Sequence, residues 1–244
     1  MKSAESVPEA IHEYHLHGYA VLRLDGVAEL LLGLKNELSV DPHQGGQRNI
    51  LLSNPRVWGI VGALKSVAQI CLGDAVSVVR GILFDKQPGA NWKLPFHQDR
   101  TIAVAEQIDA EGYSGWSVKE GIVHVRPPVE VLEKTVAIRV HLDRCHADNG
   151  ALRVIPDTHK LGMLSADAIE RIAAKQNQVT LEVGEGDIVL MSPLLLHASS
   201  PAVSPSHRRV IHLEYSSAGL PKGLQFPDWQ DMVLRLHASL QGDS

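Results

Sequence analysis

The spacing of apolar residues divides the chain into a helical first third and a strand-rich remainder. Apolar positions recur at near-helical intervals in "VPEAIHEYHLHG", "GVAELLLGLKNEL" and "PRVWGIVGALKSVAQICLG". The first and third of these segments end at a glycine, which commonly stops a helix. We therefore expect a mainly helical N-terminal part over residues 1–75, packed on whatever core follows.

From residue 77 the pattern shortens to β-rich runs. "KTVAIRVHLD" alternates, so that one face would carry only aliphatic residues and the other would carry Arg139 and His141. Further short runs, separated by turn residues, are "SVVRGILFD", "ALRVIP", "QVTLEV", "DIVLM" and "RRVIHLEYS", and one helix is expected around "LSADAIERIAAKQ". Many short strands after a helical start predict a β-sandwich or open barrel flanked by helices.

One long segment, residues 105–134, has no clear period and contains several glycines and prolines. We expect it to be a loop inserted into a core over residues 77–216. Its stretch "GWSVKEGIVHVRPP" fits either a lid that closes over a substrate or an insertion packed on the barrel. Neither a repeat nor a linker interrupts the sequence, so residues 1–244 are expected to form one domain.

Composition and charge narrow the function. Hydrophobic residues make up 44% of the chain and the net charge is −5, with no run of Lys or Arg. These values exclude nucleic acid and anionic membranes as expected partners. The apolar stretches are shorter than the ~20 residues that a spanning helix needs, and the N-terminus lacks the apolar core of a signal peptide. We expect a cytoplasmic monomer or small homo-oligomer that acts on a small molecule.

The candidate chemistry begins with His-x-Asp, because residues two apart in a strand share a face and can form half of a metal site. The pattern occurs three times, at His97/Asp99, His141/Asp143 and His146/Asp148. The third lies in a turn-like loop, where two such residues need not share a face. The first and second each follow or end a strand, and spacing alone leaves both open.

A third ligand is offered by His197, which follows the apolar run of "GDIVLMSPLLLHASSP". A histidine in this position also fits a packed core residue. Two histidines and one carboxylate leave other metal positions open, as non-haem Fe(II) requires in order to bind a cosubstrate and oxygen. A structural zinc site would close its fourth position, usually with thiolates, and the two cysteines do not have that spacing.

Strand parity separates the two arginines of "HRRVIHLEY". Arg208 shares a face with polar residues and could enter a cavity, where a guanidinium binds a carboxylate through two parallel hydrogen bonds. Arg209 shares a face with apolar residues, so its head group is expected to reach solvent. The alternative is an exposed cationic pair at the start of a strand.

Four segments in order, "FHQD", "HLDRCHADNGALRVIPDTHK", "GDIVLMSPLLLHASS" and "HRRVIHLEY", resemble the phytanoyl-CoA dioxygenase family of Fe(II)/2-oxoglutarate oxygenases. The resemblance runs from about residue 77 to 216 and departs from the family at Asp157, where Gly is usual. It implies a mainly β fold, a double-stranded β-helix (a cupin-like jelly roll) with flanking helices.

The resemblance also selects the first His-x-Asp pair. It implies that His97, Asp99 and His197 bind iron and that Arg208 holds the distal carboxylate of 2-oxoglutarate. Gln98, Ser199 and, more loosely, Ile82 match positions that line the cosubstrate site.

The implied reaction consumes 2-oxoglutarate and O2, releases succinate and CO2, and hydroxylates an unactivated C–H bond of a small metabolite. Related halogenases replace the carboxylate ligand, so the presence of Asp99 favours hydroxylation, while desaturation and ring formation stay open.

The candidate substrate-binding residues are Trp92, Trp116, His124, Arg126, Arg139 and His141. The face that carries Arg139 and His141 could line the barrel interior or form a polar outer surface. Two other functions compete with the oxygenase. One is a non-catalytic jelly-roll protein that binds a small carboxylate, and the other is a cupin-type hydrolase or isomerase that uses another divalent metal.

Overall fold

Two antiparallel sheets form the core of the protein, and the computed structural model describes residues 6–242. The larger sheet has the order β1 (Tyr19–Leu22), β11 (Ile188–Met191), β8 (Thr135–His141), β13 (Arg208–Ser216), β3 (Ser77–Lys86) and β2 (Gly46–Gln47). The smaller sheet has the order β10 (Val179–Leu181), β9 (Leu152–Ile155), β12 (Leu196–Ser199) and β4 (Leu94–His97). Side chains of both sheets line one internal cavity, so the sheets face each other as in a jelly roll. The expected jelly-roll barrel is confirmed.

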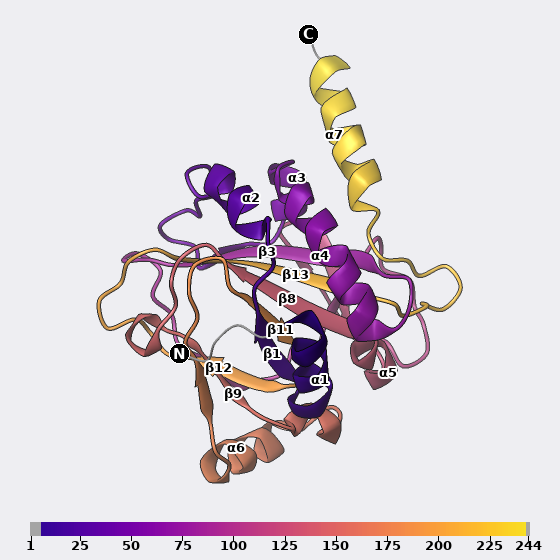
Figure 1. Cartoon of the computed structure of the whole chain (residues 1–244). Helices are drawn as coiled ribbons and strands as arrows, with labels where there is room; N and C mark the ends of the chain where they lie inside the picture. The colour runs from indigo at the N-terminus through magenta and orange to yellow at the C-terminus, as the bar shows by residue number, and fades with distance from the viewer. Residues whose placement is uncertain (1–5, 243–244) are drawn as a thin grey trace.

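Helices cover the outer face of the larger sheet (Figure 1). They are α1 (Val7–His17), α2 (Val27–Leu34), α3 (Ile50–Ser53) and α4 (Val57–Leu72). The alternation in β8 explains this arrangement, because Val136, Ile138 and Val140 belong to the buried cluster shared with the helices. The neighbouring positions, Arg139 and His141 among them, face the barrel interior. Of the two alternatives for this face, the one in which it lines the barrel interior is therefore correct.

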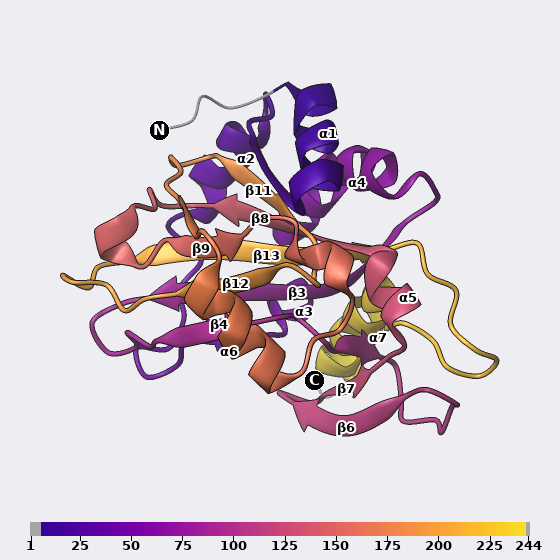
Figure 2. The same ribbon diagram turned by 90° about the horizontal axis from the view of Figure 1, so that it is seen from below.

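The smaller sheet is covered by α6 (Ala166–Lys175), which lies on the opposite side of the molecule from α4 (Figure 2). Its Ile169 packs with Ile155 of β9 and Leu196 of β12. The last helix, α7 (Trp229–Gly242), extends away from the barrel in Figure 1. No helix within residues 6–242 combines the length and apolarity needed to span a membrane.

The prediction of a loop over residues 105–134 is wrong. The segment contains the hairpin of β6 (Ser114–Lys119) and β7 (Ile122–Arg126), which forms a third sheet with β5 (Ile102–Val104), and the short helix α5 (Val129–Glu133). The two residues of the hairpin turn, Glu120 and Gly121, have φ values of 51° and 77°. Positive φ at both positions is the type I′ geometry that fits the twist of a hairpin.

The mainly helical N-terminal part also holds strands that the pattern does not predict. β1 lies between α1 and α2 and pairs with β11 in the barrel, with Ala20 opposite Leu190. Later in the chain, the extended segment expected around His97 forms β4, which stops at His97, and the unpredicted β12 is also only four residues long. These strands are too short to show a clear periodicity in the sequence. Pairing with neighbouring strands of the sheet determines where they form.

Candidate metal centre

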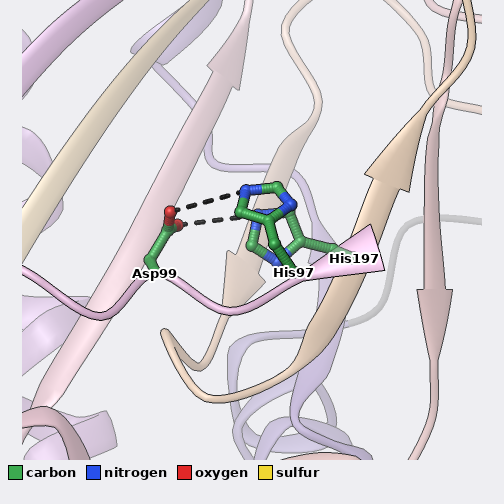
Figure 3. A group of neighbouring side chains, drawn as sticks. All are labelled: His97, Asp99 and His197. Atoms are coloured by element: carbon green, nitrogen blue, oxygen red, sulfur yellow. Dashed lines mark ion pairs between the residues drawn. The ribbon is translucent and has the colours of Figure 1, made fainter. Parts of the chain in front are cut away.

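Two side chains that are close in sequence, His97 and Asp99, meet the distant His197 inside the barrel (Figure 3). His97 ends β4 and lies directly opposite His197 of β12, and their ring centroids are 4.2 Å apart. The Nε2 atom of His97 lies 3.9 Å from Oδ1 of Asp99, and Nε2 of His197 lies 3.6 Å from Oδ2. The structure therefore brings together the first predicted pair and the predicted distal histidine.

Both imidazoles are oriented by the backbone. Nδ1 of His97 lies 2.9 Å from the carbonyl oxygen of Pro95, and Nδ1 of His197 lies 2.9 Å from that of Leu195. A carbonyl only accepts, so each Nδ1 carries the hydrogen and each Nε2 is left with a lone pair. This arrangement is typical of histidines that bind a metal through Nε2.

Asp99 does not lie on the strand, because β4 ends at His97. The same-face argument from strand geometry was therefore wrong, although the two side chains do meet. Asp99 is held by its backbone N–H, which donates to the carbonyl of Pro193 at 2.8 Å. Burial alone would raise the pKa of its carboxyl group, but His197, His212 and Arg80 together lower it below its ordinary value.

The donor set fits a divalent iron. Burial lowers the pKa of His197 to about 4, so this imidazole is neutral near pH 7. Two nitrogen donors and an ionised carboxylate on one side of a metal suit non-haem Fe(II).

Asp99, His212 and Glu214 form a second close group. Both ring nitrogens of His212 already have hydrogen-bond partners: Nδ1 lies 3.0 Å from Arg139 Nη1, and Nε2 lies 3.1 Å from Glu214 Oε1. Neither nitrogen is therefore free to bind a metal.

The other two His-x-Asp pairs form no metal cluster within the described residues. Asp143 is bound by Arg209, with Nε to Oδ2 at 2.8 Å and Nη2 to Oδ1 at 2.9 Å. The buried His141 has no hydrogen-bond partner at either ring nitrogen, and burial lowers its pKa to about 3. Asp148 lies in a 3₁₀ turn that follows His146.

The two neighbouring arginines have different surroundings. Arg208 is 3% exposed and lines the cavity, and its Nε has no hydrogen-bond partner. Arg209 was expected to reach solvent, and this expectation is wrong. Its guanidinium, besides binding Asp143, donates to the backbone carbonyls of Lys35 and Leu38. Of these two arginines, Arg208 is therefore the one available to an anion in the cavity.

Of the predicted cosubstrate residues, Ile82 and Ser199 line the cavity beside Arg208, whereas Gln98 does not. The buried amide of Gln98 points into the surrounding loops. It donates to the carbonyls of Gly162 at 2.8 Å and Leu194 at 2.7 Å, and it accepts from the N–H of Leu164 at 2.9 Å. Its contacts are those of a residue that ties the loops around the cluster together.

The predicted substrate residues divide into two groups. Trp92 and Arg139 line the cavity. The other four lie outside the cavity lining. Trp116 packs in the cluster of the third sheet, His124 is buried in β7, Arg126 is exposed on β7, and His141 is buried in β8. His124 Nδ1 lies 2.9 Å from the carbonyl of Ile122, and burial lowers its pKa to about 4.

Several cavity residues were missed from the sequence, namely Arg80, Phe84, Leu94, Leu152 and His212. Strand parity could have found two of them, because Arg80 and Phe84 share the face of Ile82 on β3. Parity did place His212 on the polar face of Arg208, but His212 was not chosen as a site residue. Leu94 and Leu152 lie on strands of four residues, which are too short for parity to be read.

Comparison with known proteins gives a family and a fold. The Phytanoyl-CoA dioxygenase (PhyH) family model matches residues 50–210. AviO1 from Streptomyces viridochromogenes Tue57 has 19% identity and a TM-score of 0.64, covering 90% of this chain and 99% of that chain. EctD from S. alaskensis, solved with 2-oxoglutarate and 5-hydroxyectoine, has 21% identity and a TM-score of 0.62, covering 88% and 78%. The α-ketoglutarate-dependent carbocyclase SnoK has 15% identity and a TM-score of 0.64, covering 88% and 87%. These structures share the fold, and no curated protein matches the sequence.

Proposed function

The chain belongs to the phytanoyl-CoA dioxygenase family, and from this premise we propose that it is an Fe(II)- and 2-oxoglutarate-dependent dioxygenase. The proposed reaction hydroxylates an unactivated C–H bond of a small metabolite. One observation carries the proposal. The His97–Asp99–His197 cluster and the buried guanidinium of Arg208, which has no acidic partner among the described residues, open into the same cavity.

In this proposal the chain holds iron through Nε2 of His97, Nε2 of His197 and the carboxylate of Asp99. When bound, Fe(II) and 2-oxoglutarate supply the oxidising chemistry with O2 and release succinate and CO2. Because Asp99 occupies the carboxylate position, no ligand position is vacated for a halide, and this favours hydroxylation. SnoK is described as a carbocyclase, so ring formation is the outcome to test beside it.

The rest of the cavity would bind and orient the cosubstrate. Arg208 would hold its distal carboxylate through charge-assisted hydrogen bonds, with the hydroxyl of Ser199 on the same wall. The side chains of Ile82, Leu94 and Leu152 exclude water from this wall, which strengthens the electrostatic interaction. EctD, which shares the fold, contains 2-oxoglutarate, and this supports the assignment of the cosubstrate.

The test is an anaerobic titration of the metal-free protein with Fe(II) and then with 2-oxoglutarate, followed by the visible charge-transfer band of a chelated keto acid. We expect the band in the wild type and in Asp143→Ala, and its loss in Asp99→Ala. Asp143 is the matched control, because it also follows a histidine by two residues but is bound to Arg209. Folded, iron-loaded protein without the band would contradict the proposal and would favour a carboxylate-binding protein or a hydrolytic metalloenzyme.

A further inference from the structure

Three arginines, Arg80, Arg139 and Arg208, enter the cavity from the larger sheet. Arg80 is paired with the carboxylate of Glu214 and lies 3.4 Å from Oγ1 of Thr101. Arg208 is the residue assigned to 2-oxoglutarate in the proposed function. Arg139 has neither role: like Arg208 it forms no ion pair with any described residue, and it is only 6% exposed, but no ligand has been assigned to it.

The contacts of Arg139 leave its charge uncompensated. Its Nη1 donates to Nδ1 of His212 at 3.0 Å, and its Nε is buried without a hydrogen-bond partner. Since Nδ1 accepts this bond, the ring hydrogen of His212 lies on Nε2, which faces Glu214 Oε1 at 3.1 Å. Arg139 therefore has a neutral imidazole as its partner, and Phe84 lies under its guanidinium at 5.6 Å.

A count of the charges around the cavity leaves Arg139 without a counter-charge. The cavity walls carry the three arginines and Asp99, and Glu214 pairs with Arg80 behind them. The two positive charges of Fe(II) and the two negative charges of 2-oxoglutarate cancel. One positive charge is left over, and burying an ion without a partner is unfavourable.

Two other buried groups near the Arg208 end do not change this count. Lys86 donates to the carbonyl of Ser200 and lies 5.2 Å from the ring of Trp92. Burial lowers its pKa to about 8, so it stays mostly protonated near pH 7, and the adjacent carboxylate of Asp85 offsets its charge. Asp85 points to the other face of β3, where it bonds to His207 Nδ1 at 2.7 Å. Burial lowers the pKa of Arg139 only to about 10, so this residue keeps its proton.

Arg139 and Arg208 also occupy different levels of the barrel. Arg139 is in register with His212, whereas Arg208 is in register with Lys86, four residues away along β13. Four residues of strand span about 13 Å, so the two side chains leave the backbone at well-separated points, although after burial the charge of Arg208 is the next cause of the lowered pKa of Arg139. The two arginines therefore approach the cavity from different points, which allows two anion positions, one for the cosubstrate and one for another ligand.

We propose that Arg139 binds a carboxylate of the substrate, so that the enzyme acts on a small carboxylic acid. This inference rests on the proposed function and narrows its substrate class. A single unmatched positive charge suits a carboxylate better than a phosphate monoester, which carries about −1.5 to −2 at pH 7. The planar fork of a guanidinium matches the two oxygens of a carboxylate.

The experiment uses anaerobic protein saturated with Fe(II) and 2-oxoglutarate, at constant ionic strength. Acetate, propionate and benzoate are compared with acetamide, propionamide and benzamide, and the readout is the change in Tm. We expect at least one carboxylate to raise Tm while its amide does not. The apparent Kd of that carboxylate should rise about tenfold or more in Arg139→Gln, which keeps a donor for His212. Arg139→Met gives a second variant, and Arg171→Met, an exposed arginine on α6, should behave as wild type.

Three results would overturn the inference. The first is equal behaviour of acids and amides, including no effect of either, and the second is a carboxylate effect that persists in both Arg139 variants. The third is a tenfold or larger rise in the Kd of 2-oxoglutarate in those variants, which would assign Arg139 to the cosubstrate. In all three cases the wild type keeps its charge-transfer band with 2-oxoglutarate. Loss of the band would instead signal that the proposed function itself fails.

Discussion

The adjacent residues Arg208 and Arg209 should respond oppositely to the same substitution. Arg208→Met removes the only cation assigned to the distal carboxylate of 2-oxoglutarate. Loss of one partner of a buried, hydrogen-bonded charge pair costs about 2 to 5 kcal/mol, so the Kd of 2-oxoglutarate should rise about 30-fold to several thousand-fold. The ligand-free protein should not lose stability, because the buried Arg208 has no acidic partner there.

Arg209→Met should act on stability instead. It breaks the two-point contact with Asp143, whose side chain is only 14% exposed, and removes donors from the carbonyls of Lys35 and Leu38. A broken pair of this kind costs about 3 kcal/mol, at the lower end of the range for buried pairs because some solvent reaches it. For a chain of this size that loss lowers Tm by about 6 to 12 °C.

The assay pairs two measurements on each variant, the Tm without ligands and the Kd of 2-oxoglutarate from the anaerobic charge-transfer titration. We expect each variant to change one measurement and to leave the other close to wild type. Equal increases in Kd for the two variants would refute the assignment of Arg208 by strand parity. A large loss of Tm in Arg208→Met would show that its charge is compensated in the ligand-free protein.

Contacts around the site determine the effects of Gln98→Leu, His141→Phe and Glu120→Ala. Gln98→Leu removes three buried hydrogen bonds and should lower the free energy of unfolding by about 3 kcal/mol in urea; unchanged stability with weaker 2-oxoglutarate binding would instead place the residue in the cosubstrate site. Burial lowers the pKa of His141 to about 3. Between about pH 6.5 and pH 3 the unfolded chain therefore binds a proton that the folded chain does not, and the folded state loses stability as the pH falls below about 6.5. His141→Phe should remove about 3 kcal/mol of the stability change between pH 7 and 4.5, and parallel pH curves for variant and wild type would contradict this. Glu120→Ala breaks the contact between the β6–β7 turn and Arg48, at 2.7 Å to its backbone N–H; we expect a stability loss below about 1 kcal/mol but severalfold faster amide exchange in residues 114–126, and unchanged exchange would show that this contact does not hold the hairpin in place.

Strand parity predicted the cavity wall formed by β8 and β13 from the sequence alone, whereas the metal ligands were selected by the family resemblance. It assigned Arg208 and Arg209 to different faces of one strand, and it placed Arg139 beside His141 on a polar face. In the structure the same alternation separates the face of β8 packed under the helices from the interior face. Parity succeeds here because β8 and β13 are long enough for the alternation to be read.

Other parts of the site depend on contacts that local sequence does not encode. Asp99 meets the histidines although it lies outside β4, because a hydrogen bond to Pro193 holds its backbone. The pairing of Arg80 with Glu214 joins residues that are 134 positions apart. The β6–β7 hairpin was missed because its turn is Glu-Gly, which is less distinctive than Asn-Gly or Asp-Gly.

The order of strands in the larger sheet has a consequence for how the protein matures in the cell. β13, the last strand of the barrel to be synthesised, pairs with both β3 and β8 and carries Arg208. His97 cannot pair with His197 until the ribosome has synthesised a further 100 residues. Contacts over such separations form slowly, and a nascent chain that ends before residue 197 would present an incomplete ligand set. Metal capture should therefore follow translation of nearly the whole barrel, which limits the time in which an unfinished chain can bind a competing metal ion.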